Sequence, residues 1–178
     1  MKRIGSSSST VEPASRTLAA LHSSRSLDSP VGTIRVGAVD SYVDPPVAGV
    51  AEGEALVSAM PLSWAPCSIL NSGEIKMVGN PVSGQNVKGK IVIYPTVTGS
   101  TSGAFGLLFK IKGTGNGPAG IICRNLHTLD LSGALAGDIP SVDGLDKDPI
   151  ETIKTGDWVK IEAPKIGGKA TVTITRKG

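Results

Sequence analysis

The strongest constraint on the fold is one segment in the middle of the chain, where a buried strand leads through a glycine-rich loop into a helix. Residues 90–94 read Lys-Ile-Val-Ile-Tyr, a β-branched run between a glycine and a proline, which is typical of a buried strand. After the loop of residues 95–103, apolar residues recur at helical spacing over 104–111. Residues 119–123 then form a second apolar run. This strand–loop–helix–strand unit indicates an α/β domain.

The rest of the chain is predicted to be rich in short strands. The 23 glycines and 12 prolines require many tight turns, and aromatic residues make up only 3%, which favours a core of Val, Ile, Leu and Ala. A short helix is expected over 127–136, ending at a glycine. Further strands are predicted over 33–39, 54–58, 74–78, 139–142, 158–163 and 169–175.

The length of 178 residues suits one folded domain preceded by a tail. Residues 1–30 are serine-rich and are expected to be a flexible tail, with residues 31–178 forming the domain. A transit peptide is a second interpretation of this start, although Glu12 and Asp28 count against it, and an arm that folds onto a partner is a third.

The charge distribution argues against nucleic acid or membrane as a partner. The net charge is +3, but four basic and two acidic residues lie in the first 30, which leaves 14 basic and 13 acidic residues in the domain. No basic stripe with stacking aromatics is present, and no apolar run approaches the roughly 20 residues that span a bilayer. No signal peptide is recognisable, so we expect a cytoplasmic protein.

The loop after the central strand is the best candidate for chemistry. It contains Gly99, Ser100, Thr101, Ser102 and Gly103, with the hydroxyl residues near the start of the helix. One interpretation is a structural helix cap. Another is a site for a phosphate or carboxylate, because amide N–H groups and the helix dipole attract negative charge. The same groups could instead stabilise a serine alkoxide and make it a base.

Other polar residues of the domain give weaker indications. Two distant cysteines lack the spacing of a metal site and fit a reducing compartment, so no metal is assigned to this chain. We expect Cys123 in the core, and Cys67 either packed or lining a site. His127 is expected to be exposed or to cap a helix. Three acidic residues are expected in a solvated loop without calcium-binding spacing: Asp143, Asp146 and Asp148.

Several segments together resemble a known family. Their order and spacing are similar to the small subunit, or swivel domain, of the aconitase X family over about residues 47–163, which implies a swivelling β/β/α fold. The segments that carry the resemblance are Gly53-Glu54-Ala55-Leu56-Val57-Ser58, Pro61-Leu62-Ser63-Trp64, Gly84-Gln85, Gly89-Lys90-Ile91-Val92, Gly99-Ser100-Thr101-Ser102-Gly103, Pro118-Ala119-Gly120-Ile121-Ile122, Ile139-Pro140-Ser141-Val142-Asp143-Gly144 and Thr155-Gly156-Asp157-Trp158-Val159.

The resemblance implies a hydro-lyase that removes water from a hydroxy acid. In this family a large subunit holds an iron–sulfur cluster, and the small domain closes over the site. The resemblance therefore implies a heterodimer or larger complex, in which this chain binds no cofactor and is inactive alone. It assigns Ser100 as the proton acceptor. Substrate binding or loop support is expected from Gly99, Thr101, Ser102, Gly103, Ser63 and Cys67.

Two departures from the family pattern bear on the substrate. The family often has basic residues just before the loop glycine, where this chain has Thr96-Val97-Thr98, and phosphate favours Arg or Lys. We therefore expect an unphosphorylated hydroxy acid such as cis-3-hydroxy-L-proline. The second departure lies at residues 66–69, which read Pro-Cys-Ser-Ile where the family usually has Gly-Gly-Val-Asp. The alternatives are a phosphomevalonate dehydratase small subunit, a non-catalytic anion-binding swivel or regulatory module, and a purely structural interaction domain.

Overall fold

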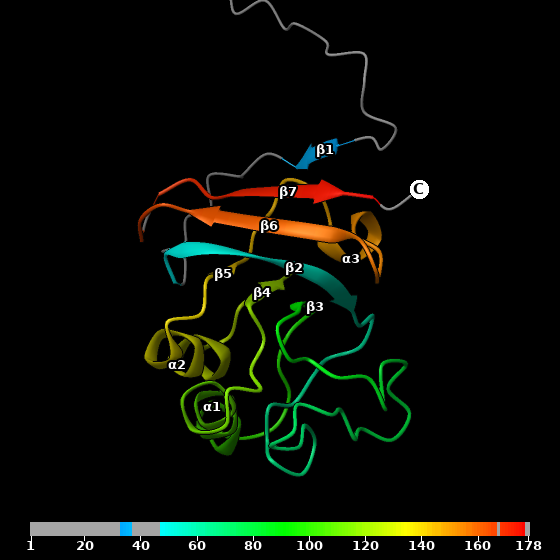
Figure 1. Cartoon of the computed structure of the whole chain (residues 1–178), viewed down its shortest axis with the longest axis vertical. Helices are drawn as coiled ribbons and strands as arrows, with labels where there is room; N and C mark the ends of the chain where they lie inside the picture. Colours follow the sequence, from blue (N-terminus) through cyan, green and yellow to red (C-terminus); the bar gives the residue numbers. More distant parts are fainter. Residues whose placement is uncertain (1–32, 37–46, 167, 177–178) are drawn as a thin grey trace, which may run out of the picture.

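The computed structural model describes residues 33–36, 47–166 and 168–176, so the predicted tail lies outside the described residues. The described part forms a mixed sheet with short helices, as Figure 1 shows. The strands are β1 (Thr33–Val36), β2 (Gly49–Val57), β3 (Ile91–Tyr94), β4 (Gly120–Cys123), β5 (Ser141–Val142), β6 (Trp158–Ala163) and β7 (Thr171–Thr175). The helices are α1 (Ser102–Leu108), which continues into the π-helix η1 (Phe109–Gly113), α2 (Thr128–Gly137) and α3 (Pro149–Thr152).

The sheet has the strand order β1-β7-β6-β2-β3-β4-β5 and consists of two halves. β1, β7, β6 and the first part of β2 are antiparallel, whereas β3, β4 and β5 are parallel to one another. β2 joins the halves, because residues 49–54 pair with β6 and residues 55–57 pair with β3. In Figure 1 the antiparallel strands cross the upper half of the molecule, and α1 and α2 lie together at the lower left.

The parallel strands bury both of their faces. All four residues of β3 are buried, and their side chains alternate between two cores because successive side chains of a strand point to opposite faces. Val92 and Tyr94 belong to a helix-side core, together with residues of α1, α2 and the loops of 62–87. Ile91 and Ile93 belong to a sheet-side core, together with residues of β6 and β7.

Most predicted elements are confirmed, and three differ. The segment 74–78 is not a strand, because only isolated bridges at Glu74 and Ile75 pair it with neighbouring loops. The strand predicted over 54–58 begins earlier, at Gly49, where its half-exposed residues pair with β6. The short helix α3 was not predicted; Asp148 caps it and Pro149 occupies its first turn. Of the strand predicted over 33–39, residues 37–39 lie outside the described residues.

Candidate active-site loop

The glycine–serine loop lies where the carboxyl end of β3 turns into α1. Gly99 has a φ of +107°, a conformation that side chains rarely adopt, so the turn requires glycine. Ser100, Thr101 and Ser102 are exposed to solvent. The hydroxyl oxygens of Ser100 and Ser102 lie 2.9 Å apart and share a hydrogen bond. The backbone therefore presents a pair of coupled hydroxyl groups at the surface.

Helix capping does not occupy these hydroxyl groups. Thr101 is the N-cap residue of α1, but it has helical backbone angles and its side chain makes no cap hydrogen bond. Within the described part of the chain, the amides of Ser100, Thr101 and Ser102 donate to no protein acceptor. Three amide donors and two hydroxyl groups of one turn are thus available to a ligand, as the anion-site and alkoxide interpretations require.

Ser63 lies beside the loop. The segment around Leu62 runs parallel to the segment around Val97, and the amide of Thr98 donates to the Leu62 carbonyl at 2.8 Å. A Cβ atom placed on Gly99 would lie 3.1 Å from Oγ of Ser63, which shows how closely the two segments approach. The structure therefore brings together two segments that are about 35 residues apart in the sequence.

Cys67 is not joined to the loop. It is exposed, and its thiol contacts the hydroxyl group of Ser68 at 3.9 Å rather than any loop residue. Burial lowers the pKa of Lys110 to about 8, and the nearby Cys67 raises that pKa to a smaller degree. This contact with Ser68 therefore does not support a direct role for Cys67 at the Ser100 loop.

Trp64 is the buried support beneath the helix that follows the loop. A Cβ atom on Gly106 would lie 2.1 Å from the Trp64 carbonyl oxygen, so only glycine allows α1 to approach this closely. The same carbonyl accepts a hydrogen bond from Nζ of Lys110 at 3.1 Å. Lys110 is fully buried in the π-helix, and it also donates to the carbonyl of Gly106 at 3.1 Å.

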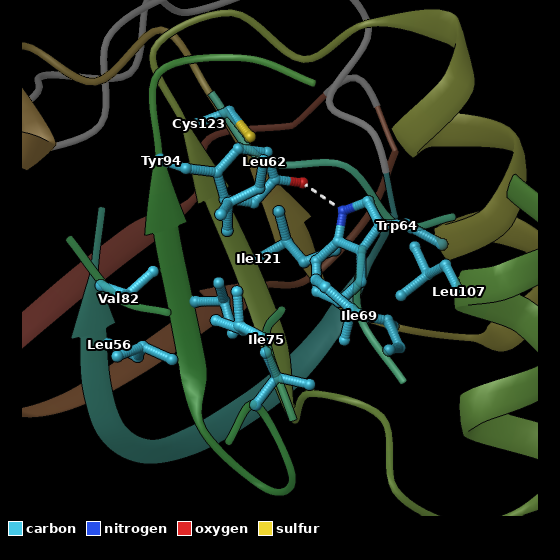
Figure 2. Close-up of a cluster of buried hydrophobic side chains, with 14 of the residues drawn as sticks. Leu56, Leu62, Trp64, Ile69, Ile75, Val82, Tyr94, Leu107, Ile121 and Cys123 are labelled. Atoms are coloured by element: carbon cyan, nitrogen blue, oxygen red, sulfur yellow. Dashed lines mark hydrogen bonds between the residues drawn. The ribbon is translucent and has the colours of Figure 1, made fainter. Parts of the chain in front are cut away.

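A chain of hydrogen bonds links Trp64 to α2 through β3. Nε1 of Trp64 donates to the hydroxyl group of Tyr94 at 2.9 Å, as Figure 2 shows, and that hydroxyl donates to Oδ1 of Asp130 at 2.8 Å. Burial raises the pKa of Asp130 to about 6 and raises the pKa of Tyr94 and of the nearby Cys123 thiol. Within the described residues, Oδ2 of Asp130 has no hydrogen-bond partner.

The sequence analysis missed Lys110 and Asp130. Lys110 follows Leu107 by three residues, which places it on the apolar face of the helix, and this spacing was an available signal. Asp130 lies in the first turn of α2, where a carboxylate is normally explained by the helix dipole. Its burial depends on contacts with Tyr94, 36 residues away, and no local pattern reports such a contact.

The remaining candidates behave as the sequence predicts, except for two of the three acidic residues. His127 is exposed and caps α2, because its ring nitrogen accepts from the amide of Leu129 at 3.4 Å. Cys123 is buried in the helix-side core. Asp148 is not simply solvated, because it caps α3 and forms an ion pair with Arg124 at 2.7 Å. Asp143 is half-buried, and its Oδ2 accepts from the amide of Leu126 at 2.9 Å.

A groove of about 300 Å³ runs between α1 and α2 next to the loop. Thr101, the neighbour of Ser100, belongs to its lining, and so does Phe105. Phe105 is 74% exposed, and Phe109, one helical turn further on, is 51% exposed. A pair of exposed phenylalanines beside the Ser100 loop is typical of a surface that a partner covers. The structure therefore joins an apolar face to the candidate site.

The described residues do not supply a metal site or a membrane-spanning helix. Over the described ranges, no three His, Cys, Asp or Glu side chains are grouped so that they could ligate a metal ion, so this part of the chain does not fit an iron–sulfur cluster. Among the helices of the described residues, none is long and apolar enough to cross a bilayer.

Comparison with known proteins decides the family. The family model described as "Aconitase X swivel domain" matches residues 42–172. The chain belongs to the aconitase X swivel domain family. The match spans both halves of the sheet, the Ser100 loop and the groove. The predicted swivelling β/β/α fold is confirmed by a crystal structure of aconitase X in its holo-form from Thermococcus kodakaraensis, with a TM-score of 0.66 and 30% identity over 78% of this chain and 98% of that chain.

Curated relatives of this aconitase X swivel domain are small subunits of a dehydratase. The phosphomevalonate dehydratase small subunit of Thermococcus kodakarensis is 35% identical over 117 residues, which cover 66% of this chain and 85% of the relative. The protein of the same name from Methanosarcina mazei is 32% identical over 73% of this chain and 87% of the relative. The chain is therefore a small subunit of an aconitase X-type dehydratase, a hydro-lyase.

Proposed function

We propose that Ser100 is the proton acceptor in the dehydration of a hydroxy acid and that a large subunit completes the site. One observation carries the proposal. The Ser100 hydroxyl is exposed next to the Ser102 hydroxyl, in a turn whose three amide groups have no acceptor within the described part of the chain. A serine hydroxyl is a poor base unless its alkoxide is stabilised by such donors.

The proton step follows from this geometry. The C–H bond next to the substrate carboxylate breaks, and its proton moves to the alkoxide Oγ of Ser100. The electron pair forms the C=C bond as the bond to the β-hydroxyl group breaks. The hydroxyl group would leave on the side of the substrate opposite Ser100, where the partner's cluster would supply the Lewis acid that accepts it. The Ser102 hydroxyl, 2.9 Å from Oγ of Ser100, donates a hydrogen bond that stabilises the alkoxide before the transfer. Closure of the domain over the substrate would exclude water and strengthen these interactions.

The partner is a large subunit that carries the iron–sulfur cluster expected for the family. The described residues of this chain do not fit such a cluster, so its ligands are assigned to the partner. The partner must reach Ser100, and the apolar groove lined by Thr101 and Phe105 begins one residue from it, with the exposed Phe109 one helical turn beyond Phe105. We therefore place an apolar segment of the large subunit in this groove, in a heterodimer. The two free cysteines fit the reducing conditions of the cytoplasm.

The substrate is proposed to be a hydroxy acid without phosphate, with cis-3-hydroxy-L-proline as the leading compound. Residues 95–109 contain no Lys or Arg, and the next residue, Lys110, is buried and donates to two backbone carbonyls. A phosphate group in the loop would therefore find amide donors but no cationic side chain of this segment.

A second candidate is phosphomevalonate. The curated relatives from Thermococcus and Methanosarcina are named for that substrate, and this observation favours it. In this case the cations that hold the phosphate would belong to the large subunit. A direct comparison of the two substrates with the reconstituted complex separates the candidates.

The test is the Ser100→Ala variant, assembled with the large subunit under exclusion of oxygen. We expect dehydration to fall by about 1000-fold or more, as for removal of other catalytic bases, while assembly is unchanged. Ser83→Ala is a matched control, because Ser83 is an exposed serine outside the groove whose hydroxyl donates to the Ile75 carbonyl. Activity of Ser100→Ala close to that of Ser83→Ala would remove Ser100 from the base role. An anion-binding module without catalysis would instead show ligand binding by the lone chain and no dehydration in the complex.

A further inference from the structure

Trp64 is fixed at both ends by buried polar groups. Its indole N–H donates to the Tyr94 hydroxyl at 2.9 Å, and its backbone carbonyl accepts from Nζ of Lys110 at 3.1 Å. Asp130 completes the chain by accepting from Tyr94 at 2.8 Å. Only 1% of Trp64 is exposed, and the other three residues are fully buried. The residues come from four separate segments: a loop, the end of β3, the π-helix and α2.

The segment that carries Ser100 rests on this fixed tryptophan. A Cβ atom on Gly103 would contact the Cβ of Trp64 at 3.7 Å, and one on Gly106 would overlap the Trp64 carbonyl oxygen. The amide of Gly103 donates to the carbonyl of Ser100 at 2.9 Å. We therefore expect a displacement of Trp64 to reach the backbone of Ser100 through Gly103.

Packing alone does not explain the polar groups. Burying Lys110 and Asp130 opposes folding, and Oδ2 of Asp130 lacks a partner among the described residues. Apolar residues of similar size would fill the same space. The hydrogen bonds add a defined orientation. They fix the rotation of the Trp64 indole ring and the position of the Trp64 backbone carbonyl, whereas apolar contacts have no preferred direction. Tyr94 also packs edge-on against Trp64, with ring centroids 6.1 Å apart.

We propose that Tyr94, Asp130 and Lys110 are positioning residues that hold Trp64 and, through it, set the location of the Ser100 hydroxyl. This inference rests on the proposed function of Ser100. None of the three touches the exposed surface of the loop, so none is expected to contribute to substrate binding. Their effect should therefore be on kcat, because a displacement of reacting groups by about 1 Å costs up to about 100-fold in rate.

The kinetic test uses Tyr94→Phe in the reconstituted complex. The variant keeps the ring but removes the hydroxyl that joins Trp64 to Asp130. We expect kcat to fall about 10- to 100-fold with KM within about twofold of wild type. Asp130→Asn keeps an acceptor oxygen for Tyr94 and should retain most of kcat, whereas Asp130→Ala should resemble Tyr94→Phe. Ile174→Val in the sheet-side core is the control for lost stability and should leave kcat unchanged.

A second test needs no partner and no substrate. The chain has two tryptophans, so a ¹H–¹⁵N correlation spectrum of the lone chain contains two indole N–H signals. The signal that is absent in a Trp158→Phe variant belongs to Trp158, which assigns the other to Trp64. Tyr94→Phe should shift the Trp64 indole signal and the amide signals of residues 99–103, whereas the separate variant Asp130→Asn should leave both close to their wild-type positions. If only the indole signal moves, or if Ile174→Val lowers kcat as much as Tyr94→Phe, the positioning role is wrong. If the wild-type complex dehydrates neither substrate while the amide signals of residues 99–103 still shift in Tyr94→Phe, the proposed reaction is wrong, but the coupling of Trp64 to the Ser100 loop is supported.

Discussion

The two faces of the parallel strands are packed by different kinds of side chain. The sheet-side core, between β3–β5 and β6–β7, is built from Ile, Val and Ala, and its nearest buried carboxylate is Asp157 at the turn into β6. The helix-side core contains a lysine, an aspartate, a tyrosine and a tryptophan joined by hydrogen bonds. The Ser100 loop leaves the helix-side core. The comparison suggests that one face supplies stability and the other supplies a defined geometry.

The largest effect is expected where α1 meets Trp64. Gly106→Ala would place a Cβ atom 2.1 Å from the Trp64 carbonyl oxygen, which a backbone group cannot avoid without moving the helix. We expect a loss of about 3 kcal/mol in the free energy of unfolding together with loss of activity. Urea denaturation measures the first effect.

The control for this variant is Gly156→Ala, at the turn before β6. Gly156 has a φ of +96° with nothing within 4 Å of the added Cβ, so backbone strain alone should cost about 1–2 kcal/mol. Equal losses of unfolding free energy in the two variants would mean that the contact of α1 with Trp64 costs no more than backbone strain at a turn. A larger loss for Gly156→Ala would contradict the expectation that the largest effect lies where α1 meets Trp64.

The next effect is a pH dependence that belongs to the helix-side core. The pKa of Asp130 is about 6 in the folded chain and lies near its ordinary value of 3.8 when unfolded. Between these values the folded state binds more protons, so the free energy of unfolding falls as pH rises from about 4 to 6, by about 3 kcal/mol.

Asp130→Asn isolates this contribution, because the amide oxygen can still accept from Tyr94 and no charge is buried. Relative to wild type, the variant should gain about 3 kcal/mol between pH 4 and 7, with little difference below pH 4. Urea midpoints across this range measure it. Parallel profiles for the two proteins would show that Asp130 does not titrate with a raised pKa. Ile174→Val, in the sheet-side core, should stay parallel to wild type throughout.

A third prediction concerns the outer surface of the same helix. Phe105→Ser and Phe109→Ser remove exposed apolar side chains, so the stability of the lone chain should change little. If the large subunit covers the groove, each variant should weaken the complex about tenfold or more, as burial of an aromatic residue in an interface is worth over about 1 kcal/mol. Titration of labelled small subunit with large subunit measures the dissociation constant.

Val78→Ser is the matched control, because Val78 is fully exposed on a turn outside the groove. Its complex should have the wild-type dissociation constant. Unchanged affinity of both phenylalanine variants would exclude the groove as the contact. Concentration-dependent self-association of the lone wild-type chain, lost in Phe105→Ser, would assign the groove to a second copy instead.

The sheet-side core was far easier to predict from the sequence than the helix-side core. The alternation of β6 and the apolar run of β3 are local patterns. β6 was found where the period of two predicts a strand, and β3 was found where the β-branched run between a glycine and a proline predicts one. The segment 74–78 has a similar composition but pairs only through isolated bridges, because its neighbours are loops rather than strands. Pattern alone does not reveal whether a partner strand exists.

The candidate site was predictable only in part, for the same reason. The Ser100 loop is a local motif, and Ser63 was identified from the resemblance to a family before the structure placed it beside Gly99. The hydrogen bonds of Trp64 to Tyr94 and Lys110 join residues 30 and 46 positions apart. Such contacts depend on how β3, α1 and α2 pack together, and no regular spacing of residues in the sequence marks them.

The smallest effect is expected where the two halves of the sheet meet. Lys90, just before β3, forms an ion pair at 2.7 Å with Glu54, the last residue of β2 that pairs with β6. Both side chains are partly exposed, so a double-mutant cycle with Lys90→Met and Glu54→Gln should give a coupling below about 1 kcal/mol that weakens with salt. A coupling of 2 kcal/mol or more would mean that this ion pair contributes strongly to holding the two halves of the sheet together. A small coupling would leave the continuous backbone of β2 and the apolar contacts of the sheet-side core as the links between the antiparallel and parallel halves.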